Sequence, residues 1–544
     1  MSIPDFYIKI YMFSYNKPSI NQRRFIFLKV IKKFFINGMV LTLTSVFMRF
    51  VSVVFNVYIT NKIGSVGMGL FSLVLSVYTF GVTFATSGVH LASTRLVSQE
   101  LVKGSGVGVR IAMRKCLAYS LAFGALSFVV LFYFAEPISL KWLCDIRAVK
   151  SLKILAISLP FLSVSSALGG YFCAVRRVIK NAITNILEQF IRIFLTVTLF
   201  VLISGDDVES ATVAVVIGMS VSEILAFIVS FILYVFDVRK NTKELKGEPS
   251  SNITMRLLKM SLPVAFSAYI RSALMTLENL LIPKGLIRGG VNSDAALSSY
   301  GIISGMVFPV IFFPLAFLSA FSSLVIPEIT RYKEQGEKKH IDYVTRRIFK
   351  LTLIFSVAIS GLFIYYSDLL GMFLYDSREA GFYIKIFAAL IPVMYLDNSI
   401  DAVLKGMGEQ VYSMRYNIID ALVSVILVYF LLPPLGIKGY VIVVYVCELI
   451  NAALSMQRLF KILTLKVNIF FDVFAPVFSI VGATSLCSIL FHFMNIKFSF
   501  TASSFICGLC ISILLYYIFL RITYCVTSED EKWFTEIFKS KKNV

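Results

Sequence analysis

Apolar residues occur along this chain in long runs that are separated by short polar segments. Fourteen runs are about 20–28 residues long, and about 20 apolar residues in a helix are enough to cross a bilayer. The pattern therefore predicts an all-α polytopic membrane protein with about fourteen transmembrane helices. The expected spans are 37–62, 67–90, 114–135, 150–174, 180–204, 211–236, 258–283, 298–325, 346–367, 380–404, 411–433, 438–460, 471–493 and 501–524.

Three groups of residues recur in the same order and at nearly constant separation. Arg49 and Lys62 recur as Arg271 and Lys284, N-I-L-E (185–188) recurs as N-I-I-D (417–420), and V-S-E-I (221–224) recurs as V-C-E-L (446–449). The recurrence predicts two six-helix bundles followed by two C-terminal helices. Because six is even, both bundles have the same orientation across the membrane, so we expect a parallel pseudo-two-fold repeat with substrate between the halves.

The repeat and the loop charges together divide the chain into segments. The composition is 58% hydrophobic and only 15% charged, against about 25% charged in soluble domains. The net charge of +21 fits basic cytoplasmic loops rather than nucleic-acid binding, and the acidic loop 205–210 is expected outside. The predicted segments are a basic cytoplasmic N-terminal segment (1–36), the N-terminal half (37–237), a cytoplasmic linker (238–257), the C-terminal half (258–460), helices 13 and 14 (461–525) and a cytoplasmic tail (526–544).

Several classes of protein are disfavoured by the residue content. The C-x-x-C of Cys507 and Cys510 lies in an apolar span, where redox or zinc chemistry lacks polar access, and only three histidines are present. The outer loops are short and offer no large catalytic domain. We therefore expect no catalytic residues, no metal site, no bound cofactor and no enzyme activity.

Charged side chains inside the spans are the candidate functional residues, because each costs about 2.5–3.5 kcal/mol on insertion scales. Arg49 and Arg271 lie near the middle of the first and seventh helices, with no acid within four residues. Asn56 and Glu278 follow two turns further along the same helix faces. A guanidinium can contact two phosphate oxygens at once, so we expect these four residues to bind an anionic substrate.

A second set of charged residues has two open interpretations: it couples transport to an energy source, or it ties helices together. Glu188 and Arg192 have the spacing of an ion pair on one helix face, as do Asp401 and Lys405. The remaining members are Asp397, Asp420, Glu223 and Glu448.

Four stretches give the chain a family resemblance that covers about residues 37–525. They are L-P-F-L-S-V-S-S-A-L-G-G-Y-F (159–172), N-I-L-E-Q-F-I-R (185–192), M-S-L-P-V-A-F-S-A-Y-I-R-S (260–272) and V-I-P-E-I-T (325–330). The chain resembles the multidrug/oligosaccharidyl-lipid/polysaccharide (MOP) exporter superfamily, and within it the stage V sporulation protein B type of polysaccharide flippase. The lipid II flippases are a neighbouring branch. Arg49 stands where that branch has its first cavity arginine, whereas Phe55 and Asn56 stand where it has a second arginine and an acid.

The resemblance implies a transport function in the cell membrane, with both termini cytoplasmic. The implied activity is movement of a polyprenyl-pyrophosphate-linked oligosaccharide or peptidoglycan precursor to the outer leaflet by alternating access, in cell-wall or spore-cortex synthesis. The implied partners are this lipid-linked glycan, membrane lipids and the cell-wall synthesis machinery. The membrane potential and an H⁺ or Na⁺ gradient both stay open as driving forces. A cation-coupled multidrug exporter of the same superfamily is the alternative.

Overall fold

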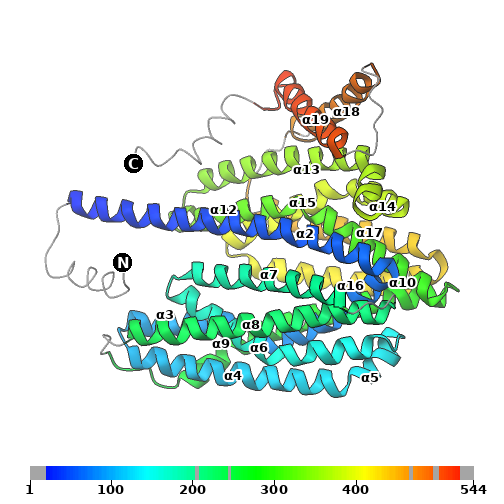
Figure 1. Ribbon diagram of the computed structural model, residues 1–544. Coiled ribbons are helices and arrows are strands. Elements are labelled where there is room, and N and C mark those ends of the chain that lie inside the picture. The colour runs from blue at the N-terminus through cyan, green and yellow to red at the C-terminus, as the bar shows by residue number, and fades with distance from the viewer. Residues whose placement is uncertain are drawn as a thin grey trace. The chain divides into compact units, whose positions relative to one another are not determined.

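In the computed structural model, the described residues are 20–202, 207–242, 247–464, 468, 470–493 and 502–526, and their side chains are described except at 20–43, 240–242, 321, 323–324 and 502–504. All regular elements in this part are helices (Figure 1). The predicted all-α fold is therefore confirmed. The predicted tail, apart from residue 526, and all side chains of the predicted N-terminal segment 1–36 lie outside the described part.

The first part of the chain forms long helices joined by short turns. These elements are α2 (Ile20–Thr86), α3 (Val89–Val102), α4 (Gly106–Tyr133), α5 (Ala135–Pro137), the π-helical turn η1 (Ile138–Leu143), α6 (Ala148–Ala174), α7 (Val178–Leu202), α8 (Val208–Thr242) and α9 (Ile253–Arg288).

The second part contains more breaks. Its elements are α10 (Ser293–Gly301), η2 (Ile302–Val307), α11 (Phe308–Phe312), α12 (Leu315–Glu334), α13 (Lys338–Tyr375), α14 (Arg378–Ala388), α15 (Ile391–Gly406), α16 (Gln410–Leu435), α17 (Ile437–Ile462), η3 (Phe470–Phe474), α18 (Ala475–Phe493) and α19 (Ala502–Ile522).

The described residues contain twelve helical stretches long and apolar enough to cross a membrane, or thirteen if the bent pair α14–α15 counts as one span. The first stretch, Thr44–Val102, has 59 residues. At about 1.5 Å per residue it would be roughly 90 Å long, three times the hydrocarbon core of a bilayer. Gly64, with φ 70° and ψ 178°, interrupts the helix and separates the two expected spans 37–62 and 67–90. Only glycine adopts that conformation without strain.

Two expected spans are interrupted by a break. The apolar stretch predicted at 298–325 ends at Phe312, and α12 begins after Pro314. Proline favours such a break because it lacks the N–H that continues a helix. The span predicted at 380–404 consists of α14 and α15, which meet at an angle of 55° just before Pro392.

Contacts divide the chain into two compact units. Unit 1 is Met1–Thr44 with Val66–Lys284, and unit 2 is Ser45–Ser65 with Gly285–Val544. Residues 45–65 of α2 therefore belong to unit 2, whereas α9 up to Lys284 belongs to unit 1. These boundaries differ from the predicted halves, which follow the sequence repeat, by one helix in each direction.

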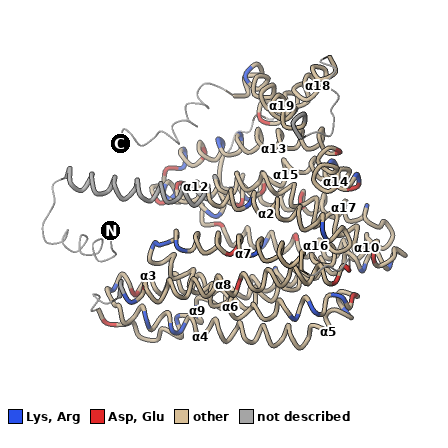
Figure 2. Tube along the Cα trace, viewed as in Figure 1, with Lys and Arg blue, Asp and Glu red and all other residues tan. Residues whose placement is uncertain are grey.

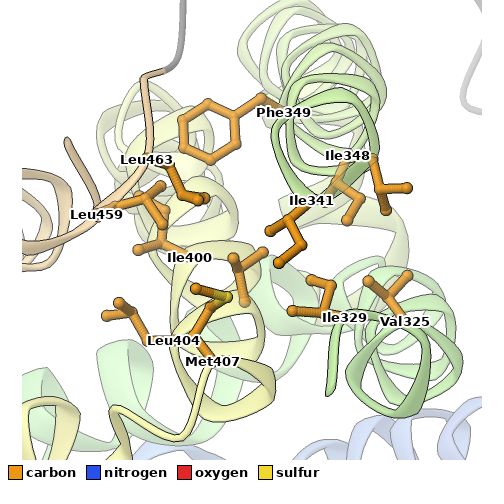
Figure 3. Packing of buried hydrophobic residues seen from close by; sticks show 12 residues of the cluster. Val325, Ile329, Ile341, Ile348, Phe349, Ile400, Leu404, Met407, Leu459 and Leu463 are labelled. Atoms are coloured by element: carbon orange, nitrogen blue, oxygen red, sulfur yellow. The ribbon is translucent and has the colours of Figure 1, made fainter. Parts of the chain in front are cut away.

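Each unit has its own apolar core. In unit 2, Ile329, Ile400 and Leu404 are fully buried between α12, α13 and α15, and Figure 3 shows side chains of this cluster pointing toward one another. In unit 1, Val97 of α3, Val109 of α4 and Leu168 of α6 are fully buried in a corresponding cluster. Most charged residues lie toward helix ends, as Figure 2 shows, so the few near helix centres stand out.

The predicted linker 238–257 is partly helical and partly attached to unit 1. Helix α8 continues to Thr242, and α9 begins at Ile253. Between them, Gly247 N donates to Gly104 O at 2.9 Å, and Ser250 N donates to Glu100 Oε2 at 3.2 Å. A Cβ at residue 247 would lie 2.4 Å from Lys103 O, so this close backbone approach requires glycine.

Candidate functional site

Arg49 lies on the part of α2 that belongs to unit 2, and its side chain is exposed. It forms no hydrogen bond or ion pair with any residue that the structure describes. Asn56, two turns further on, is half-buried, and within the same described part its Oδ1 is buried without a hydrogen-bond partner. The first predicted substrate position is thus a guanidinium that no described protein group neutralises.

Arg271 lies at the centre of α9, in unit 1, and its side chain is also exposed. It likewise has no ion pair or hydrogen bond to a described residue. Glu278 is half-buried on the same helix.

A polar stripe beside Arg271 attaches α9 to the rest of unit 1. Its members Tyr269, Ser272, Thr276 and Asn279 share one helix face by their spacing. Tyr269 Oη contacts Ser87 Oγ, and Thr83 Oγ1 donates to Ser272 Oγ at 3.2 Å. Thr276 Oγ1 donates to Ser76 O at 3.2 Å, and Asn279 Nδ2 donates to Ser76 Oγ at 3.1 Å. Such small polar contacts commonly join membrane helices.

The charges of α7 form the ion pair that their spacing predicted. Arg192 Nη2 lies 2.5 Å from Glu188 Oε1, and the two side chains are 21% and 26% exposed. Arg192 Nε also lies 3.5 Å from Ser222 Oγ on α8. Local pairing therefore meets the charge of Arg192, in contrast to Arg49 and Arg271.

Glu223 lies at the centre of the apolar stretch Val208–Arg239 of α8 and is 8% exposed. Its Oε2 lies 2.6 Å from the Oη of Tyr78 on α2. That Oη in turn lies 2.7 Å from the Oγ of Ser158 on α6. Three helices of unit 1 thus meet at one buried polar group.

In unit 2, the acids of α15 have polar neighbours. Lys405 Nζ lies 2.5 Å from Asp401 Oδ2, as the spacing predicted, and Ser413 Oγ donates to Asp401 Oδ1. Asn451 Nδ2 of α17 donates to Asp397 Oδ2 at 3.0 Å. Asp420 and Glu448 are half-buried on α16 and α17.

Sequence reasoning missed a buried acid at the end of α8. The side chain of Asp237 is fully buried, and its carboxylate contacts Arg177 and Lys180, the latter at 2.6 Å. Tyr171 Oη donates to its other oxygen at 3.0 Å. A lone acid at the end of an apolar run, together with the basic turn 176–180, was the available signal.

Across the described residues, no three His, Cys, Asp or Glu side chains gather in a way that could hold a metal ion. The described candidate residues can act electrostatically. They comprise the exposed guanidinium groups of Arg49 and Arg271, the ion pairs, and the buried carboxyl group of Glu223 near two hydroxyl groups.

Comparison with known proteins identifies the family. The family model described as "Polysaccharide biosynthesis protein" matches residues 34–333, more than half of the 544-residue chain, and the model described as MatE matches residues 268–430. Stage V sporulation protein B of Bacillus subtilis (strain 168) is 24% identical over 449 residues, which are 80% of this chain and 86% of that protein. The lipid II flippase MurJ of the same organism is 22% identical over 414 residues, 71% of this chain and 75% of that protein.

Solved structures share the fold. A lipid II flippase MurJ in an inward closed conformation has a TM-score of 0.68 at 14% identity, covering 89% of this chain and 99% of that chain. An inward-facing MATE family multidrug resistance transporter of the MOP superfamily has a TM-score of 0.59 at 13% identity, covering 76% of this chain and 95% of that chain. The chain therefore belongs to the polysaccharide biosynthesis protein family of the MOP exporter superfamily and is a multi-pass membrane transporter.

Proposed function

We propose that this protein flips a polyprenyl-pyrophosphate-linked oligosaccharide or peptidoglycan precursor from the inner to the outer leaflet by alternating access. The family match and the relatives named stage V sporulation protein B, sporulation protein YkvU and lipid II flippase MurJ support this substrate class. The two sporulation names favour a glycan of the cell wall or spore cortex, and the cell-wall synthesis machinery as the partner that supplies or consumes it.

The observation that carries the proposal is the pair of exposed arginines. Arg49 and Arg271 lie far from helix ends, and neither has a described partner. Holding a guanidinium at such depth is costly unless water or an anion reaches it. A pyrophosphate offers several oxygens in the planar two-point geometry that arginine prefers. Arg49 and Arg271 are therefore assigned to the pyrophosphate, with Asn56 and Glu278 nearby on their helices.

We assign both termini to the cytoplasm, because loop charge is biased toward basic residues on that side. Cysteine labelling at Asp207, expected outside, and at Lys246, expected inside, would test this orientation. Asp207 is described and exposed, whereas Lys246 lies outside the described residues. Glu248, described and exposed, replaces it. In intact cells, a cysteine at residue 207 should react with an impermeant thiol reagent, and one at residue 248 should not. The reverse pattern would invert the orientation.

A cation-coupled multidrug exporter of the MATE type is the second candidate function. The MatE match over residues 268–430 and the shared fold favour it. Exposed mid-helix arginines favour anions, however, and cationic drugs would be repelled by them.

Deletion of the gene distinguishes the two functions. A flippase predicts that polyprenyl-linked glycan accumulates in the deletion strain and that re-expression clears it. A drug exporter predicts increased retention of cationic dyes with no change in lipid-linked species. The matched control is re-expression of an Arg49→Ala, Arg271→Ala double variant, which should clear nothing.

A further inference from the structure

The buried contact between Tyr78, Ser158 and Glu223 contains more hydrogen bonds than its hydroxyl groups can supply. Tyr78 Oη lies 2.6 Å from Glu223 Oε2 and 2.7 Å from Ser158 Oγ, and Ser158 Oγ lies 3.0 Å from Leu155 O. Each of these three oxygen–oxygen contacts needs one proton. Tyr78 and Ser158 have one hydroxyl proton each. Glu223, when protonated, supplies the third proton.

The two protonation states of Glu223 differ in how many of these contacts have a proton. If Glu223 is ionised, Tyr78 donates to Oε2, and Ser158 is left with one proton for two acceptors, Tyr78 Oη and Leu155 O. If Glu223 is protonated, its O–H donates to Tyr78, Tyr78 donates to Ser158, and Ser158 donates to Leu155 O. Only the protonated state satisfies all three contacts, as buried polar groups usually are.

The surrounding charges point the same way. Glu188 and Arg192 of α7 act on Glu223 by their charge, whereas Ser158 of α6 and Tyr78 of α2 act on it through hydrogen bonds. Arg192 is the single cation among them, and it is paired with Glu188 at 2.5 Å. An ionised Glu223 would therefore leave one uncompensated negative charge at the centre of an apolar bundle, which is strongly unfavourable.

We propose that Glu223 is a proton-binding site of unit 1, protonated in the conformation described here, and that it releases and rebinds this proton during transport. The released proton passes to water. The carboxylate that remains competes with Glu188 for Arg192, whose Nε already lies 3.5 Å from Ser222 Oγ, the residue next to Glu223. Deprotonation thus shifts the partner of Arg192 from α7 toward α8. The role in transport rests on the proposed flippase function, whereas the protonation state does not.

Infrared difference spectroscopy of the purified full chain in lipid nanodiscs tests the protonation state. At neutral pH, the wild-type protein should show a carboxylic-acid C=O band that Glu223→Gln removes. The matched control Glu188→Gln should retain the band, because Glu188 is the partner of Arg192 and not of the Tyr78 and Ser158 hydroxyl groups. Tyr78→Phe should keep the band but shift its frequency, because the acceptor of the Glu223 proton is lost, and it serves if the Gln variant does not fold. A band unaffected by Glu223→Gln and by Tyr78→Phe overturns the assignment.

A transport measurement tests the second part separately. In proteoliposomes with an undecaprenyl-pyrophosphate-linked disaccharide as the probe, the wild-type flipping rate should change when an imposed pH gradient is reversed. The Glu223→Gln variant should lose this dependence, and Glu188→Gln should keep it in whatever activity remains. Gradient dependence that survives Glu223→Gln contradicts a transport role. If the wild type does not flip the probe, the flippase proposal fails while the spectroscopic result still stands.

Discussion

The helix pair α7–α8 of unit 1 and the pair α16–α17 of unit 2 derive from corresponding segments of the repeat, yet they carry different charges. Glu188 corresponds to Asp420 and Glu223 to Glu448, so both acids recur. Arg192, the partner of Glu188, corresponds to Ser424. The acids are thus duplicated and the cation is not. The position four residues after the acid carries Arg192 in unit 1 and Ser424 in unit 2.

The turns before these helix pairs carry charges of opposite sign in the two units. In unit 1, Arg177 of the turn and Lys180 at the start of α7 contact Asp237 near the end of α8. In unit 2, Glu409 corresponds to Arg177, and it contacts Arg458 near the end of α17 at 2.7 Å. A similar bridge therefore joins the same elements in both units, with acid and base exchanged. The bridge in unit 1 is buried around the acid, whereas both partners in unit 2 are about a quarter exposed.

The largest expected effect on stability is at the buried bridge. Asp237→Asn should lower the free energy of unfolding by about 3–5 kcal/mol, because two cations lose a fully buried partner. Thermal denaturation in detergent should show a correspondingly lower midpoint. The control Asp207→Asn, on an exposed acid, should leave the midpoint unchanged. Equal midpoints for Asp237→Asn and the wild type would contradict the claim that the buried bridge of unit 1 is more stabilising than the exposed bridge of unit 2.

A smaller loss is expected at the α7 pair. Glu188→Ala should cost about 2 kcal/mol, less than a fully buried pair because both side chains retain some exposure. The yield of folded protein measures this loss. The double variant Glu188→Gln, Arg192→Met should recover part of it, because no charge then stays unpaired. A double variant less stable than Glu188→Ala would contradict a structural role of this ion pair in unit 1.

The sequence predicted local pairs and missed distant ones, for a physical reason. Glu188 with Arg192 and Asp401 with Lys405 were predictable because helical spacing alone brings such residues together. Tyr78 and Asp237 were not, because their partners lie on helices far away in sequence. Likewise, span positions follow from apolar runs, but the apolar pattern does not indicate the 55° bend between α14 and α15. The exchange of helices between units leaves no local sequence signal at all.

The exposed bridge of unit 2 should contribute less than its counterpart. Glu409→Gln should cost about 1 kcal/mol or less, because partly exposed pairs are weak. Arg458 also keeps its position over the Tyr412 ring, at 3.6 Å from the centroid, which limits the loss. Denaturation curves measured beside those of Asp237→Asn give the ranking. A larger loss at Glu409 than at Asp237 would reverse the proposed order.

The smallest effect is expected on the polar stripe that joins α9 to unit 1. Thr276→Val or Asn279→Leu should each cost about 0.6 kcal/mol, the average for hydrogen bonds between membrane helices. The exposed neighbour Met275→Leu is the matched control and should be neutral. Losses no greater than that of Met275→Leu would show that apolar packing alone attaches α9.

The central claim is that Arg49 and Arg271 bind the pyrophosphate while Glu188 and Arg192 organise unit 1. Flipping of an undecaprenyl-pyrophosphate-linked disaccharide in proteoliposomes, measured beside thermal stability, tests it most directly. We expect Arg49→Ala and Arg271→Ala each to abolish flipping with unchanged stability, and the Lys variants to restore it only partly, because an ammonium lacks the planar two-point contact. Normal flipping by both alanine variants, in a preparation where the wild type is active, would contradict the account.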